Sequence, residues 1–130
     1  GPIARRAASA EGYVLSPDNS PEEVNFIRSD QFSFVRQGIP SLYVIGGYKS
    51  RFRDTDVGAE LQEYLKKHYH QPSDDGSLPL HYPTAAAFTR MHVRMVMEVA
   101  DAPERPRWNR RDFFADKFGQ PRAGAPEPRP

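Results

Sequence analysis

The segment Tyr69-His70-Gln71-Pro72-Ser73-Asp74 contains the residues of this chain that are best suited to chemistry. A neutral imidazole is a common zinc ligand, so His70 is a candidate metal ligand. Pro72 restricts the backbone just after it, and the Asp74 carboxylate can orient a neighbouring group or cap the following segment. One imidazole holds no metal tightly, and histidines are also ordinary residues of surfaces and turns. Residue chemistry alone therefore leaves both roles open for His70.

Other potential metal ligands lie close to this segment in the sequence. Asp54, Asp56 and Glu60 are carboxylates in and after a charged stretch, where we expect them to be solvated, as loop acids usually are. His68 precedes His70 by one intervening residue. Alternate residues of an extended segment share a face, so these two imidazoles could chelate one ion.

Local patterns predict several helices around these residues. Residues 3–10 are rich in alanine and arginine and predict the end of a helix, which Gly12 can terminate. Residues 59–67 predict a short helix before the histidine turn. The strongest pattern covers residues 84–100, where apolar side chains follow the helical i, i+3, i+4 spacing. On that stripe His92 is expected to be a hydrogen-bonded residue at the edge of the core.

Two apolar runs predict strands and therefore an α/β fold. Residues 13–15 are a short strand candidate, and residues 39–45 form a β-branched, apolar run that Gly46-Gly47 follows. Such a run is typical of a buried strand in a parallel sheet, here covered by the helix at residues 84–100. Ligands collect at the carboxyl ends of such strands, so Gly46-Gly47 would mark the edge of the site.

The motifs occur in an order that resembles a known family. Arg28-Ser29-Asp30-Gln31-Phe32 is followed by Gly38-Ile39-Pro40 and the apolar run, and then by Tyr-His-Gln-Pro-Ser-Asp. From Tyr13 to Phe114, including the closing Trp108-Asn109-Arg110-Arg111-Asp112-Phe113, the chain resembles the C-terminal third of the di-zinc aminopeptidases of peptidase family M28. The resemblance implies a three-layer α/β sandwich with a mixed, mostly parallel sheet, incomplete in this chain.

The resemblance also implies a metal site. Two zinc ions, roughly 3.5–4 Å apart, would polarise a peptide carbonyl and activate a bridging water. His70 matches the last histidine ligand, and His68 would face solvent. The other ligands of the family belong to motifs that precede this region, so the upstream part of the catalytic domain would be a required partner. Glu22-Glu23 is not the catalytic Glu-Glu pair, because it follows Pro21 in a turn-rich segment where the family has other acidic residues.

Four further residues match functional positions of the family. Tyr69 matches a tyrosine whose hydroxyl stabilises the tetrahedral intermediate, although a packing aromatic would explain it as well. Ser29 and Asp30 match positions that line the substrate pocket, and Arg28 could pair with a substrate carboxylate. Helix capping is the alternative role for Ser29 or Asp30 at the start of a short helix, whose apolar face would contain Phe34 and Val35 and which Gly38 would end.

The leading hypothesis is a zinc aminopeptidase that acts on peptide substrates, with this fragment inactive alone. A one-zinc glutaminyl cyclase is an alternative, but it would favour tryptophan where Tyr69 stands. A receptor-like module for binding or dimerisation, without catalysis, is the third hypothesis. Such receptor-like modules usually lose their metal ligands, whereas this chain retains His70.

Composition limits the other possibilities. The chain has 130 residues, 38% of them hydrophobic, and a formal net charge of +1 with both signs interspersed, which argues against a nucleic-acid or anionic-membrane partner. No apolar run has the length of a membrane span. The absence of cysteine excludes disulfides and thiol catalysis. Residues 1–118 are expected to form one part of a catalytic domain and residues 119–130 a disordered tail. The family resemblance implies export, with a secreted or periplasmic location.

Overall fold

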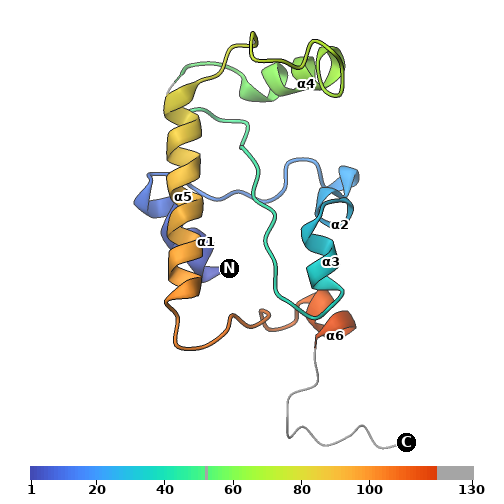
Figure 1. Cartoon of the computed structure of the whole chain (residues 1–130), viewed down its shortest axis with the longest axis vertical. Helices are drawn as coiled ribbons and strands as arrows, with labels where there is room; N and C mark the ends of the chain where they lie inside the picture. The colour runs from blue at the N-terminus through green and yellow to red at the C-terminus, as the bar shows by residue number, and fades with distance from the viewer. Residues whose placement is uncertain (52, 120–130) are drawn as a thin grey trace, which may run out of the picture. The chain divides into compact units, whose positions relative to one another are not determined.

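The computed structural model describes residues 1–51 and 53–119. These residues divide into two compact units, each assembled from two separate stretches of the chain. Unit 1 contains residues 1–19 and 45–102, and unit 2 contains residues 20–44 and, within the described range, 103–119. Helices are the regular elements of both units (Figure 1).

Unit 1 is centred on the contact between its first and last helices. Its helices are α1 (Pro2–Ala10), α4 (Val57–Lys67) and α5 (Tyr82–Ala100), and α1 packs against α5. Alanines allow two helix backbones to approach closely, because their side chains end at Cβ. The buried residues of the two helices are mostly of this kind: Ala4, Ala7, Ala8, Ala87, Met91 and Met95.

Ion pairs around this contact show that α1 and α5 run antiparallel. Arg6 pairs with Glu98. At the residue that follows α1, the Glu11 carboxylate accepts hydrogen bonds from Arg94 Nε at 2.7 Å and from Arg90 Nε at 2.9 Å. These two donors, Arg94 first, hold the pKa of Glu11 below its ordinary value.

The end of α1 follows the signal that the sequence predicts. Gly12 has a φ of 73°, its N–H donates to Ser9 O at 3.0 Å, and the N–H of Tyr13 donates to Ala8 O at 2.8 Å. This pair of bonds is a Schellman motif, which needs a residue with positive φ where Gly12 stands. The predicted helix at residues 3–10 and its termination are therefore confirmed.

The other two helices of unit 1 begin earlier than their apolar patterns predict. The α4 helix begins at Val57 rather than residue 59, because the Asp56 carboxylate accepts the Ala59 N–H at 3.0 Å. The α5 helix begins at Tyr82 rather than residue 84, with a proline in its first turn and the His81 imidazole accepting the Thr84 N–H at 3.3 Å. Among the described residues, no helix has the length and hydrophobicity that a membrane span requires.

Unit 2 contains short helices around an aromatic cluster. Phe114 lies 5.1 Å from Phe26 and 5.9 Å from Phe32, measured between ring centroids, and Phe118 lies 6.0 Å from Phe32. Trp108 Nε1 donates to Gly38 O at 2.8 Å. The regular elements of this unit are η1 (Pro21–Glu23), α2 (Asn25–Arg28), α3 (Gln31–Val35) and α6 (Phe113–Phe118).

The α3 helix confirms one part of its prediction and corrects another. It ends as predicted, with Gly38 at a φ of 79°. Val35 is fully buried, whereas Phe34 is mostly exposed. Of the two residues predicted to form the apolar face, only Val35 therefore packs in the core. The predicted capping interaction is wrong: Asp30 occupies the N-cap position without a side-chain hydrogen bond, and Ser29 Oγ donates to Asn25 O at 2.7 Å instead.

The predicted α/β sandwich is wrong for this chain. Within residues 1–51 and 53–119 no segment forms a β-strand, and the nearest feature is an isolated antiparallel bridge between Lys49 and Asp56. Residues 13–15 and 39–45 are irregular. The apolar side chains of the second run are half exposed, and the boundary between the units falls after Val44. A strand requires a neighbouring strand for its backbone hydrogen bonds, and the described residues provide none for this run.

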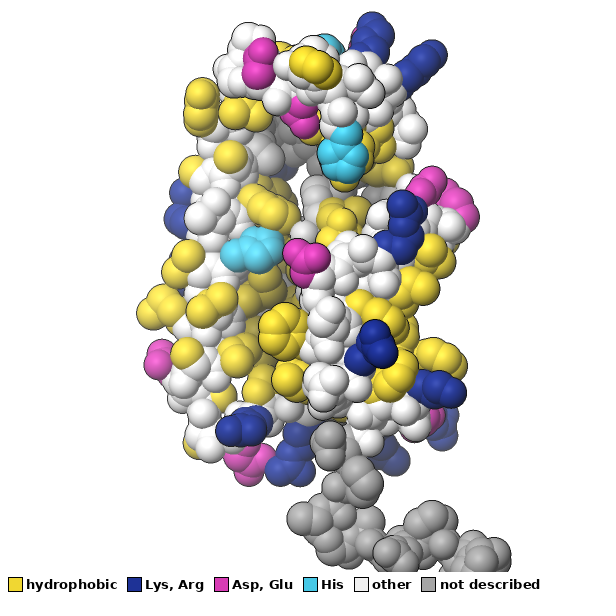
Figure 2. Space-filling view, turned by 45° about the vertical axis from the view of Figure 1, so that its right-hand side comes forward, with side chains coloured by type: hydrophobic (Ala, Val, Ile, Leu, Met, Phe, Trp, Pro, Cys, Tyr) yellow, Lys and Arg dark blue, Asp and Glu magenta, His cyan; other side chains and the backbone are white. Residues whose placement is uncertain are grey.

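Hydrophobic side chains also lie at the surface, as the yellow areas of Figure 2 show. In α5, Val93, Val96 and Met97 are exposed on the side away from the buried Met91 and Met95. The buried set is small and consists mainly of alanines, so each contact in it accounts for a large share of the core.

Of the predicted tail, Gly119 ends α6, and residues 120–130 lie outside the described range. That residues 1–118 form one part of a catalytic domain stays a prediction.

Candidate functional site

The segment that contains the candidate metal ligand is a compact turn in unit 1. It begins where α4 ends, and Tyr64 O accepts the N–H groups of His68 at 2.9 Å and of Tyr69 at 3.1 Å. The N–H of Gln71 then donates to His68 O at 2.8 Å. Between these bonds, His70 has a φ of 58°, a left-handed conformation that is unusual for a residue with a side chain.

Tyr69 and His70 are both accessible. His70 is exposed, and Tyr69 has 46% of its surface exposed. The two rings stack with centroids 3.8 Å apart and an angle of 24° between their planes. The structure thus brings the predicted ligand and the predicted hydroxyl donor together on the surface of one turn.

Tyr64, in the last turn of α4, contacts this turn and was not singled out by the sequence. Its hydroxyl donates to Asp74 Oδ2 at 2.8 Å, so Asp74 does hold a neighbouring group, as its position suggests. The hydrogen bond to this carboxylate raises the pKa of the Tyr64 hydroxyl. The only signal in the sequence is an aromatic residue in the last turn of a helix, which usually indicates packing.

The resemblance implied that His68 faces solvent, but in the structure it is only partly exposed. It is half-buried, and its Nδ1 lies 3.0 Å from Ser73 Oγ. Ser73 Oγ also donates to Lys67 O at 3.3 Å. The His68 ring therefore holds the turn against the end of α4 through one of its nitrogens.

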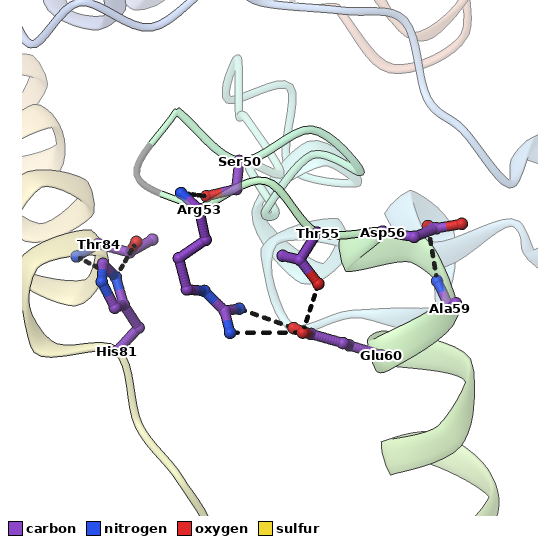
Figure 3. Close-up of polar contacts among 8 residues, drawn as sticks. All are labelled: Ser50, Arg53, Thr55, Asp56, Ala59, Glu60, His81 and Thr84. Atoms are coloured by element: carbon purple, nitrogen blue, oxygen red, sulfur yellow. Dashed lines mark hydrogen bonds and ion pairs between the residues drawn. The ribbon is translucent and has the colours of Figure 1, made fainter.

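A groove of about 640 Å³ lies next to the turn in the same unit. His68 lines it together with Tyr64, and charged residues contribute to its wall. One of these is Arg53, which donates to the two carboxylate oxygens of Glu60 at 3.3 and 2.7 Å (Figure 3). The apolar lining residues come from α4 and from the segment before α5: Val57, Leu61, Leu78, Pro79 and Leu80.

The acidic residues near the turn have structural contacts. Glu60 accepts a hydrogen bond from Thr55 Oγ1 at 2.8 Å in addition to those from Arg53, and these donors, Thr55 first, lower its pKa. Asp56 caps α4. Figure 3 shows Asp56 pointing to Ala59 and away from Glu60. Two of the three loop acids that were expected to be solvated, Asp56 and Glu60, therefore bond to protein groups.

The predicted substrate-binding residues belong to unit 2. Arg28 Nη1 lies 3.2 Å from Glu23 O and 3.4 Å from Glu23 Oε2, and both side chains of this ion pair are exposed. Ser29, which follows α2, is hydrogen bonded to Asn25 of that helix, and Asp30 is exposed just before α3. Tyr69 and His70, by contrast, belong to unit 1.

The described residues fit one zinc ligand and not a complete zinc site. The His70 imidazole is accessible and is of the type that zinc prefers. Across residues 1–51 and 53–119, however, no group of three or more histidine, cysteine, aspartate or glutamate side chains could hold a metal ion. Tight binding would require ligands from outside this part of the chain.

Comparison with known proteins decides the family. Residues 2–96, most of the chain, match the sequence profile of peptidase family M28. The chain belongs to this family. The M28 match includes the turn with Tyr69 and His70, whereas the Trp108–Phe113 part of the resemblance lies beyond it and stays a prediction. No curated protein and no solved structure matches the chain.

Proposed function

We propose that this M28 chain is part of a zinc aminopeptidase, to which it contributes His70 as a metal ligand and Tyr69 as a hydroxyl donor. The observation that carries the proposal is that the family match includes a turn on which these two side chains are adjacent and accessible. Zinc, when bound, would supply a Lewis acid and an activated water. Arg28, Ser29 and Asp30 remain the proposed contacts to the peptide substrate.

We also propose that the isolated chain has no peptidase activity. A single imidazole ligand provides little affinity for zinc, because structural and catalytic sites use three or four protein ligands. Calorimetry with zinc should therefore give a dissociation constant no tighter than micromolar, and a chromogenic aminoacyl substrate should not be hydrolysed. Nanomolar zinc affinity, or hydrolysis that a chelator abolishes, would contradict this part of the proposal.

The decisive test uses the complete enzyme, with the residues that supply the remaining ligands. His70→Ala should remove one zinc ion and most of the activity, because a direct ligand is lost. Tyr69→Phe should lower kcat by about 10²- to 10³-fold with both ions retained, as expected for the loss of one oxyanion donor. Zinc content by elemental analysis and turnover of an aminoacyl substrate are measured on the same preparations.

His68→Asn is the matched control for His70→Ala. Asparagine places an amide group near the position of Nδ1, so it can keep the contact with Ser73 while it removes the rest of the imidazole. This variant should retain both zinc ions and most of the activity. Loss of zinc from His68→Asn but not from His70→Ala would show that the wrong histidine is assigned. Full zinc and turnover in His70→Ala would show that His70 is not a zinc ligand. An unmodified enzyme without zinc or turnover would leave the non-catalytic binding module as the better hypothesis.

The location of the enzyme is a further part of the proposal. The family resemblance implies export, and we propose a secreted or periplasmic protein. Immunodetection in cell fractions and culture medium tests this: a protein found entirely in the cytoplasmic fraction would contradict it.

A further inference from the structure

Tyr64 contacts the histidine turn at several points. Its carbonyl accepts the two N–H groups that begin the turn, those of His68 and Tyr69. Its ring lies 6.1 Å from that of Tyr69, between centroids, and its hydroxyl donates to Asp74 at 2.8 Å. One residue at the end of α4 therefore contacts both the beginning and the end of the turn, through its backbone carbonyl and its side chain.

The bond between Tyr64 and Asp74 closes a loop around His70. Asp74 is also linked to the turn by its N–H, which donates to Gln71 O at 2.9 Å. Inside this loop His70 has a φ of 58°, which is strained for a non-glycine residue and persists only where surrounding contacts hold it. The imidazole itself is exposed, so contacts of its neighbours have to define its direction.

We infer that Tyr64 and Asp74 are a positioning pair that fixes the backbone conformation of His70 and the direction of its ring. This inference rests on the proposed function, in which that ring binds zinc. The bond is suited to the role because a neutral hydroxyl that donates to a carboxylate forms a strong hydrogen bond with a defined geometry. Tyr64 and Asp74 act through His70 and do not contact the metal or the substrate.

Nuclear magnetic resonance of the chain tests the positioning directly. The His70 ring stacks on Tyr69 at 3.8 Å, so the ring protons of His70 should resonate upfield of those of an unstructured histidine. Tyr64→Phe removes only the hydroxyl, and Asp74→Ala removes its acceptor. Both variants should lose most of this upfield shift, and Asp74→Asn, which keeps an acceptor oxygen, should restore it.

Tyr82→Phe is the matched control for the loss of a hydroxyl. Tyr82 is 74% exposed at the start of α5 and lies outside the turn, so its variant should keep the His70 shifts of the unmodified chain. Circular dichroism verifies that all variants retain their helices. Unchanged His70 shifts in both Tyr64→Phe and Asp74→Ala would overturn the inference. An equal loss in Asp74→Asn and Asp74→Ala would overturn its hydrogen-bond basis.

Zinc affinity of the complete enzyme separates this inference from the proposed function. Tyr64→Phe should weaken one zinc ion by roughly 10- to 100-fold, the usual effect of losing a group that orients a ligand. If His70→Ala loses zinc but Tyr64→Phe binds it as tightly as the unmodified enzyme, the inference fails and the proposed function stands. If His70→Ala keeps all its zinc, the proposed function fails, and the ring-proton shifts still decide whether Tyr64 positions His70.

Discussion

Replacing Ala8 with leucine should destabilise unit 1. Ala8 is 0% exposed on α1, the helix that packs against α5. If this contact had room, the three added carbons would stabilise the fold by roughly 0.8 kcal/mol each. In a close-packed contact they displace their neighbours and cost about 1–3 kcal/mol instead. The sign of the change therefore reports whether the alanine contact between α1 and α5 is close-packed.

Thermal unfolding followed by circular dichroism measures this sign. For a domain of roughly 60–100 residues, 1 kcal/mol changes Tm by about 4–8 °C, so Ala8→Leu should lower Tm by at least about 4 °C. Ala10→Leu is the matched control, because Ala10 is exposed on the same helix and leucine is nearly as good a helix former as alanine. A Tm for Ala8→Leu equal to or above that of Ala10→Leu would refute the close packing.

Two further predictions concern the residues that follow α1. Because two arginines lower the pKa of Glu11 in the folded state, its contribution to stability is present above the ordinary value of 4.5 and is lost as the pH falls through the lowered pKa. Glu11→Gln should therefore reduce the fall in Tm on acidification below that value, and an unchanged pH profile would contradict the ion pairs. The hydroxyl of Tyr13 is buried without a hydrogen-bond partner among the described residues, so Tyr13→Phe should leave the free energy of unfolding unchanged or raise it by about 1 kcal/mol. Denaturant unfolding measures it, with Tyr82→Phe as the exposed control; a loss of more than about 1 kcal/mol would indicate a partner for the hydroxyl.

Helices were predictable from this sequence because their signals are local. The stop at Gly12 and the long apolar stripe of α5 involve residues within a few positions of one another, and both predictions are confirmed. Strand formation in residues 39–45 was not predictable in the same way. An apolar, β-branched run shows that a segment suits a strand, but the strand forms only if another segment pairs with it.

The candidate site shows the same division. The motif order identified the family and selected His70, because a motif is a property of the sequence itself. The contact between Tyr64 and Asp74 depends on the path of the backbone through a turn with a left-handed residue, and no spacing rule predicts that path. Likewise, the half-buried position of His68 results from its bond to Ser73, which only the folded turn brings into reach.

The alternation of the two units along the chain has a consequence for synthesis on the ribosome. Helix α1 ends at Ala10, and its partner α5 ends at Ala100. At about 5–20 residues per second, the partner is completed roughly 5 to 20 seconds after α1. During that interval the apolar face of α1 is without the helix that buries it, and residues 20–44 are made before residues 103–119 of the same unit. Neither unit is complete until a late segment returns to an early one, so unit 1 cannot fold before α5 is made, and α1 is a segment for chaperones to protect before then.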